Sequence, residues 1–142
     1  MSIEQVNPPE LPKPSGFSHA VVSSGGRLVF LAGQTAQDAS GAIIGADVVA
    51  QFERALGNLL TALAAAGGRP EHLASLTIYS TDLRDYRRHG KQIGTVWRSL
   101  AGQRYPAMAA VGVCELWDRA AVVEIQGFAV VPAAAEPLTT GT

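Results

Sequence analysis

Apolar residues recur every three or four positions in one long stretch of the chain, residues 47–66. This spacing places them on one face of an amphipathic helix, which the glycine pair at 67–68 would end. Residues 85–100 have the same periodicity and predict a second helix, closed by Gly102. The inward positions that we expect for the two helices are Val48, Phe52, Ala55, Leu56, Leu59, Leu60, Leu63, Ile93, Val96, Trp97 and Leu100.

Five shorter runs, rich in β-branched and aromatic residues, have the composition of strands. They cover residues 17–22, 27–32, 73–81, 107–114 and 120–131. The first two flank Ser23-Ser24-Gly25-Gly26, which predicts a hairpin with a glycine turn. The order β-β-α-β-α-β-β differs from repeated βαβ units and from a sandwich. We therefore predict an α+β fold, a mixed sheet with two helices on one face.

The two ends of the chain differ in composition from this central part. Residues 1–13 are an extended, Pro-rich N-terminal segment, and residues 132–142 are an Ala/Pro/Thr tail that we expect to be mobile. Residues 14–131 then form one domain, which suits a chain of 142 residues that is 47% hydrophobic. Adjacent apolar residues such as Val122 and Val123 predict that the second face of the sheet is also covered, by another copy of the chain.

Charge and cysteine content narrow the classes of function. A formal net charge of −1 predicts no nucleic-acid partner and no membrane partner, since both favour clustered Lys and Arg. The single cysteine, Cys114, excludes an intrachain disulfide framework, so we expect a cytoplasmic protein. The three histidines lack metal-ligand spacing, and we expect no metal and no other cofactor. The one basic cluster, which we interpret as a solvated helix face, comprises Arg84, Arg87, Arg88 and Lys91.

One carboxylate stands inside an apolar strand. Glu124 lies in the run Val122-Val123-Glu124-Ile125, where a charge is costly unless a partner or a functional cavity receives it. Glu124 is therefore the candidate catalytic residue. The alternative is a structural ion pair with Arg119 or Arg104 at an interface between subunits.

Several short motifs occur together in the order that one known family shows. They are Phe30-Leu31-Ala32-Gly33-Gln34, Thr81-Asp82-Leu83, Tyr105-Pro106-Ala107-Met108 and Glu124-Ile125. With them, residues 14–131 resemble the Rid family, also called YjgF/YER057c/UK114, whose best-known members hydrolyse reactive enamines and imines. The resemblance implies the chorismate-mutase-like Rid fold, a homotrimer with a central barrel, and a small-molecule pocket at each interface between subunits.

Most polar pocket residues of the Rid deaminases are replaced in this chain. Met108 stands where the deaminases carry a carboxylate-binding arginine, while Glu124 remains at the position where the resemblance implies that it orients water. The other replacements are Phe17 for a tyrosine, Ala32 for a serine, Gly90 for an asparagine and Ala110 for a cysteine. The chain thus resembles a divergent, RidA-like member, and its pocket would favour an apolar or uncharged ligand over a 2-aminoacrylate-type substrate.

Two functions remain open. One is a metal-free, deaminase-like hydrolase acting on a small imine, enamine or amide-like metabolite, with Glu124 orienting water. The other is a non-catalytic member that binds a metabolite or a partner protein in the same cleft. His19, Arg104 and Arg119 are the alternatives for the missing arginine. The substrate-binding residues that we expect are Phe17, Ala32, Gly33, Met108, Ala109, Ala110 and Trp117.

Overall fold

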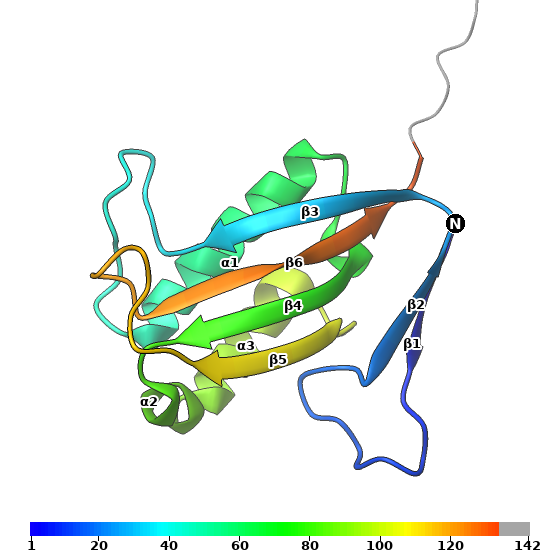
Figure 1. Ribbon diagram of the computed structural model, residues 1–142, viewed down its shortest axis with the longest axis horizontal. Helices are drawn as coiled ribbons and strands as arrows, with labels where there is room; N and C mark the ends of the chain where they lie inside the picture. Colours follow the sequence, from blue (N-terminus) through cyan, green and yellow to red (C-terminus); the bar gives the residue numbers. More distant parts are fainter. Residues whose placement is uncertain (134–142) are drawn as a thin grey trace, which may run out of the picture.

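A four-stranded mixed sheet forms the centre of the protein, for which a computed structural model describes residues 1–133. The strand order is β3-β6-β4-β5; β4 and β5 run parallel, and the other neighbours are antiparallel. The strands are β3 Arg27–Gln34, β4 Leu73–Ser80, β5 Ala107–Gly112 and β6 Val123–Val131. Helices α1 (Val48–Ala65) and α3 (Gly90–Ala101) lie behind this sheet, on one face (Figure 1). The predicted α+β fold is confirmed, while the predicted tail lies almost wholly outside the described residues.

Helix α1 matches its predicted range because local signals fix both of its ends. The Asp47 carboxylate accepts a hydrogen bond from the Ala50 N–H at 2.9 Å, which caps the first turn. Gly67, with a φ of 88°, follows the last turn in a conformation that favours glycine. The side chains that this helix buries include Phe52, Leu56, Leu59 and Leu63, the row that the periodicity predicts.

The second predicted helix is two helices, α2 (Leu83–Arg88) and α3, which meet at His89. The Asp82 carboxylate caps α2 by accepting from the Asp85 N–H at 3.0 Å. At the other end the His89 N–H donates to the Asp85 carbonyl at 3.2 Å, and Gly90, a weak helix former, follows. Periodicity does not reveal this break, because the inward residues of α3 keep their spacing after it.

The predicted hairpin is wrong. Strand β2 (Ala20–Ser24) pairs with β1 (Ser2–Val6) in a separate two-stranded sheet, and β3 pairs with β6 instead. Gly25 and Gly26 do turn the chain, with φ values of 73° and 85°, but this turn carries it from one sheet to the other. Strand β3 pairs with β6, whose alternate residues are buried in the core. The residues of the turn do not determine which strand β3 pairs with.

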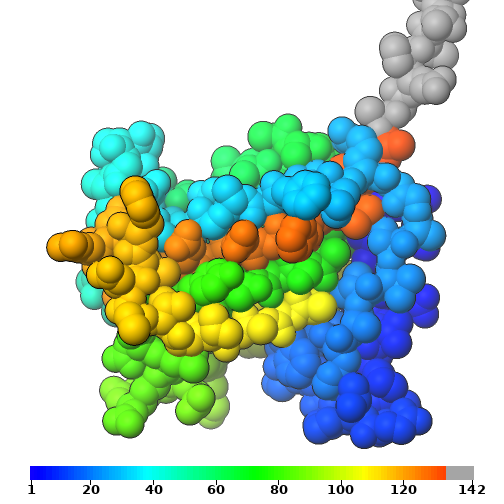
Figure 2. Space-filling view, in the orientation of Figure 1, coloured from blue at the N-terminus to red at the C-terminus, as the bar shows by residue number. Residues whose placement is uncertain are grey.

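The N-terminal segment attaches beside β5, the edge strand. Ser18 donates its N–H to the Pro106 carbonyl at 2.9 Å and its hydroxyl to the Tyr105 carbonyl at 2.6 Å. The Arg104 guanidinium donates to the Ile3 carbonyl on β1 at 3.1 Å. In Figure 2 the N-terminal residues, in blue, accordingly flank β5, in yellow. These bonds place residues 15–17 next to the edge of the sheet.

No helix of the described residues 1–133 covers the face of the sheet opposite α1 and α3. Figure 2 looks onto this open face, where side chains of all four strands lie side by side. Its largest exposed side chains are apolar: Leu28 is 58% exposed, Phe30 71% and Phe128 40%. Phe30 and Phe128 meet edge to face, with ring centroids 5.4 Å apart. No helix within residues 1–133 is long and apolar enough to cross a membrane.

Candidate functional site

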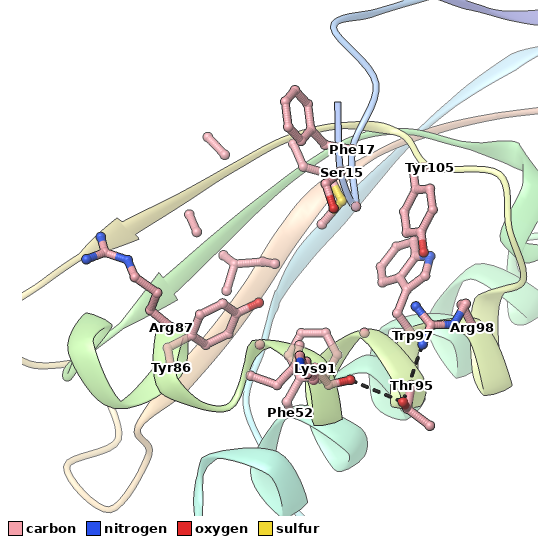
Figure 3. A pocket seen from close by; sticks show the side chains of 18 residues that line it. Ser15, Phe17, Phe52, Tyr86, Arg87, Lys91, Thr95, Trp97, Arg98 and Tyr105 are labelled. Carbon is pink, nitrogen blue, oxygen red and sulfur yellow. Dashed lines mark hydrogen bonds between the residues drawn. The ribbon is translucent and has the colours of Figure 1, made fainter. Parts of the chain in front are cut away.

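A cavity of about 900 Å³ opens between α3 and the edge strand β5 (Figure 3). Its size lies in the range of pockets that bind small molecules. Helices α1 and α3, strands β4 and β5 and the loop before β2 all contribute to its wall. The larger apolar and aromatic side chains of this lining are Phe17, Phe52, Ile78, Tyr86, Ile93, Trp97, Tyr105 and Met108.

Four of the predicted site residues line this cavity. They are Phe17, Met108, Ala109 and Ala110, and Gly90 of α3 joins them. Met108 and Ala110 project toward the helices because β5 runs parallel to β4 in a register that pairs them with Leu76 and Ile78, both buried on that side. Residues separated in sequence by more than ninety positions thus share one space.

The remaining predicted residues lie elsewhere. Glu124 alternates with buried Val123 and Ile125 on β6 and therefore faces the open side of the sheet. Its carboxylate lies against Gly33, at a bulge of β3, where a Cβ would overlap Glu124 Oε1. Ala32 precedes Gly33 in the same bulge and is exposed. One protomer therefore does not bring Glu124 to the cavity.

Trp117 is fully exposed in the loop between β5 and β6 and lines no part of the cavity. Within residues 1–133 the Glu124 carboxylate forms no ion pair with Arg104 or Arg119. His19 and these two arginines do not line the cavity either. The His19 ring binds the Pro12 carbonyl at 2.7 Å, so this histidine serves the N-terminal segment.

Three cations that sequence reasoning did not place in the site line the cavity: Arg87, Lys91 and Arg98. Arg87 and Lys91 are exposed, in agreement with the interpretation of a solvated helix face, and they also line the cavity. Within residues 1–133 no Asp, Glu, His or Cys side chain lines the cavity. A helical spacing signal did exist for two of them, since Lys91 and Arg98 share one side of α3, but it does not say what that side meets.

Two aromatic side chains bring polar atoms to the cavity wall. Burial raises the pKa of Tyr86 to about 12, so its hydroxyl stays protonated, and Figure 3 shows this hydroxyl pointing into the space. Trp97 stacks on Tyr105 with ring centroids 5.8 Å apart. Its indole Nε1 is buried and has no acceptor within residues 1–133. An unpaired buried donor of this kind costs about 1–3 kcal/mol.

The chemistry of the cavity follows from this lining. Within residues 1–133 no three His, Cys, Asp or Glu side chains lie close enough together to hold a metal ion. The lining provides donors and positive charge around an apolar floor, but no group that accepts a proton from water at neutral pH. A single protomer can thus bind a ligand here, and general-base chemistry requires a carboxylate from outside its own cavity.

Comparison with known proteins identifies the family. Residues 10–131 match the family model described as Endoribonuclease L-PSP. The chain belongs to this family, which is the Rid or YjgF/YER057c/UK114 family, as its motifs predict. A Rid-family protein of unknown function from Yersinia pestis, YyfB, has a crystal structure with a TM-score of 0.82 and 30% sequence identity, over 92% of this chain and 100% of that one.

Two further Rid relatives agree with this assignment. Protein DfrA of Myxococcus xanthus is 36% identical over 132 residues, which are 92% of this chain and 97% of that protein. A YjgF/YER057c/UK114 member from Mycobacterium tuberculosis has a TM-score of 0.61 at 30% identity, over 92% of this chain and 100% of that chain. The matches span the relatives almost end to end, so the resemblance concerns the whole Rid domain.

Proposed function

We propose that this Rid-family protein is a homotrimer whose small-molecule site forms between two copies, and that it hydrolyses a small imine, enamine or amide-like metabolite. The observation that carries the proposal is that the predicted site residues are divided between the cavity and the opposite face of the sheet. Met108 and Phe17 line the cavity, whereas Glu124 and Gly33 lie on the opposite face of the same sheet. A second copy that lays its open face against the first would bring a carboxylate to a cavity that lacks one.

Two properties of the open face support this arrangement. Its exposed Leu28, Phe30 and Phe128 provide apolar area whose burial would favour association. Its Glu124 is acidic, while the three charged residues of the cavity are basic, so the two surfaces attract each other. A contact between different surfaces on successive copies is heterologous, and a rotation of one third of a turn between copies closes it into the ring of a trimer.

The reaction would proceed by acid–base catalysis without a metal. Glu124 accepts a proton from water as the oxygen attacks the carbon of the C=N bond, and this proton then passes to the nitrogen. The carbinolamine that results loses ammonia and leaves a carbonyl product. Backbone groups near Ala109 and Ala32 are the expected donors to the developing charge. Met108 supplies no charge to a substrate carboxylate, so we expect little turnover of 2-aminoacrylate.

Glu124→Gln tests the catalytic step. With an imine generated in place by an amino-acid oxidase, this variant should lose about 10²–10⁴-fold in kcat, the usual contribution of a positioned acid or base. Ligand affinity, measured by calorimetry, should change little because the amide keeps the shape of the carboxylate. Glu115→Gln, an exposed residue in the loop after β5, is the matched control. Full turnover in Glu124→Gln would remove Glu124 from the mechanism.

The second candidate function is binding without catalysis. The observation that favours it is the lack of any proton-accepting side chain in the cavity lining. Absence of turnover in the wild-type protein on imines and enamines, together with a retained ligand affinity, would decide for this function. We do not extend the activity named in the family description to this chain, because its formal net charge of −1 offers little attraction to RNA.

A further inference from the structure

We infer that the cavity selects an anionic ligand with a ring-sized apolar body, and that Lys91 and Arg98 on α3 bind the anionic group. The inference rests on the proposed function only in taking this cavity as the site, and it names the ligand class. This inference replaces the expectation of an uncharged ligand. That expectation was based on Met108 and Phe17 and left out the cations on the helices. The anchor would lie on the helix side of the cavity rather than on β5.

The charge of the lining is the first argument. Arg87, Lys91 and Arg98 give the lining three positive charges and no negative one. Within residues 1–133 the ion pairs join Arg69 to Glu71 and His89 to Asp85, so none of the three cations has a carboxylate partner. The three residues are exposed, so they attract an anion through water, and salt weakens this attraction.

The geometry of α3 is the second argument. Lys91, Thr95 and Arg98 follow one another at i, i+4 and i+7, so they line one side of the helix over two turns, roughly 10 Å. Arg98 Nη2 donates to Thr95 Oγ1 at 3.4 Å, which holds the guanidinium along this side (Figure 3). Two cations and a hydroxyl thus face the same part of the cavity.

Two glycines leave this side of α3 open. Gly90 and Gly94 both line the cavity, and a Cβ at Gly94 would lie 3.3 Å from Arg98 Nη1. A Cβ at Gly90 would have no atom within 4 Å, so nothing of this chain fills the space beside it. Glycine inside a helix costs about 1 kcal/mol relative to alanine. This cost is offset if the missing side chains give a ligand access to Lys91 and Arg98.

The size and the apolar lining of the cavity are the third argument. Phe52, Ile93 and Met108 line it, and a three-carbon imine is too small to fill about 900 Å³ beside them. Tyr86 adds a hydroxyl that burial keeps protonated. A ring with an acidic substituent meets the apolar floor, the hydroxyl and the cations together.

Calorimetry on the full chain with four small probes tests the ligand class. Phenylacetate has both the ring and the charge, phenylacetamide has the ring alone, acetate has the charge alone, and phenyl phosphate carries a different anion. Phenylacetate should bind at least about tenfold more tightly than phenylacetamide or acetate, and this advantage should shrink as salt rises to about 0.5 M. A stronger preference for phenyl phosphate would identify the anion as a phosphate and still support the inference.

Charge-removing variants locate the anion. Lys91→Gln and Arg98→Gln should each weaken phenylacetate binding about tenfold and leave phenylacetamide binding unchanged. Arg84→Gln is the control, because Arg84 is exposed on α2 and does not line the cavity. Equal affinity for phenylacetate and phenylacetamide would overturn the inference, and so would failure of both anionic aromatic probes to bind at millimolar concentration.

The same measurements keep this inference separate from the proposed hydrolysis. If Glu124→Gln retains imine turnover while phenylacetate keeps its advantage, the role of Glu124 fails and the anion site stands. If the wild-type protein turns over a neutral imine and binds phenylacetamide as tightly as phenylacetate, the anion site fails alone. A trimer mass with either result leaves the arrangement of subunits unaffected.

Discussion

The two faces of the central sheet use the same strands but meet different surroundings. On the helix side Leu76 and Ile125 are fully buried under α1 and α3. On the open side Phe30 and Phe128, from strands of the same sheet, are exposed apolar rings. Alternation along a strand therefore tells which residues share a face but not what covers it. One face is closed by the chain itself, and we propose that a second copy closes the other.

The faces also differ in their polar residues. The helix side leads to a cavity with Arg87, Lys91 and Arg98, and the open side carries Glu124 against Gly33. Charges of opposite sign thus lie on opposite sides of one sheet, where they cannot neutralise each other within a protomer. Four substitutions, taken from the largest expected effect to the smallest, distinguish a face that stabilises the protomer from a face that joins copies.

Ile125→Ala removes a fully buried side chain from the helix side and should lower the free energy of unfolding by about 2–5 kcal/mol. The loss combines the transfer of apolar surface with the cavity left behind. Urea denaturation measures it. Gln126→Ala, the next residue on β6 and exposed on the open side, is the matched control and should change stability by less than about 0.5 kcal/mol. Equal losses would show that both faces are packed alike.

Phe30→Asp places a charge in the centre of the exposed apolar surface. The protomer should keep its circular dichroism spectrum, because Phe30 is 71% exposed and supports little of the fold. The mass measured by analytical ultracentrifugation should fall from that of a trimer to that of a single chain, because an unpaired charge would be buried in the contact. Phe30→Tyr keeps the ring and should remain trimeric. A trimer in both variants would place the contact elsewhere.

Gly33→Ala tests the close approach of β3 to the Glu124 carboxylate. The added Cβ overlaps Oε1, and since this atom ends a flexible side chain, relief by rotation should cost only about 1–2 kcal/mol of stability. The rate of turnover should also fall, because the Glu124 carboxylate changes position. In a Glu124→Ser background the same change should be nearly neutral, so the double-mutant cycle measures the coupling directly. Additive effects would contradict the contact.

The effect of Tyr86→Phe on the pH dependence of stability should appear only in alkaline solution. An unfolded tyrosine releases its proton near pH 10, whereas burial raises the pKa of Tyr86 in the folded protein to about 12. Between these values the unfolded state binds fewer protons, so wild-type stability falls as pH rises, by about 1 kcal/mol at pH 11. The Tyr86→Phe variant has no hydroxyl proton to lose at this position, so its free energy of unfolding should fall less between pH 8 and 11. Parallel curves from urea denaturation would show that Tyr86 is not desolvated.

The sequence predicts those parts of the fold that local signals determine. The range of α1 follows from its apolar spacing, the Asp47 cap and the glycine after it. The pairing of β2 with β1 could not be predicted, because a glycine turn specifies a change of direction and not a partner strand. For the same reason the sequence did not predict that β1, which lies in a segment expected only to be extended, would pair with another strand.

For the candidate site, the motifs placed Phe17, Met108 and Ala110 in what the structure shows to be one cavity. They did not place Lys91 or Arg98, because a charged residue on a helix usually faces water, and both residues are indeed exposed. That they also border a cavity depends on how α3 packs against β5, and that is a long-range property. The pairing of the motif residues with Glu124 depends on a second copy and remains a prediction.

The position of β6 determines when the protein can fold during synthesis. This strand is the last one in the described chain, yet it lies between β3 and β4, and it is the only partner of β3. A nascent chain that has left the ribosome as far as α3 therefore holds strands with unpaired edges and a gap between them. The sheet closes only after residue 131 emerges, and until then the unpaired edges of β3 and β4 stay exposed to chaperones and to aggregation.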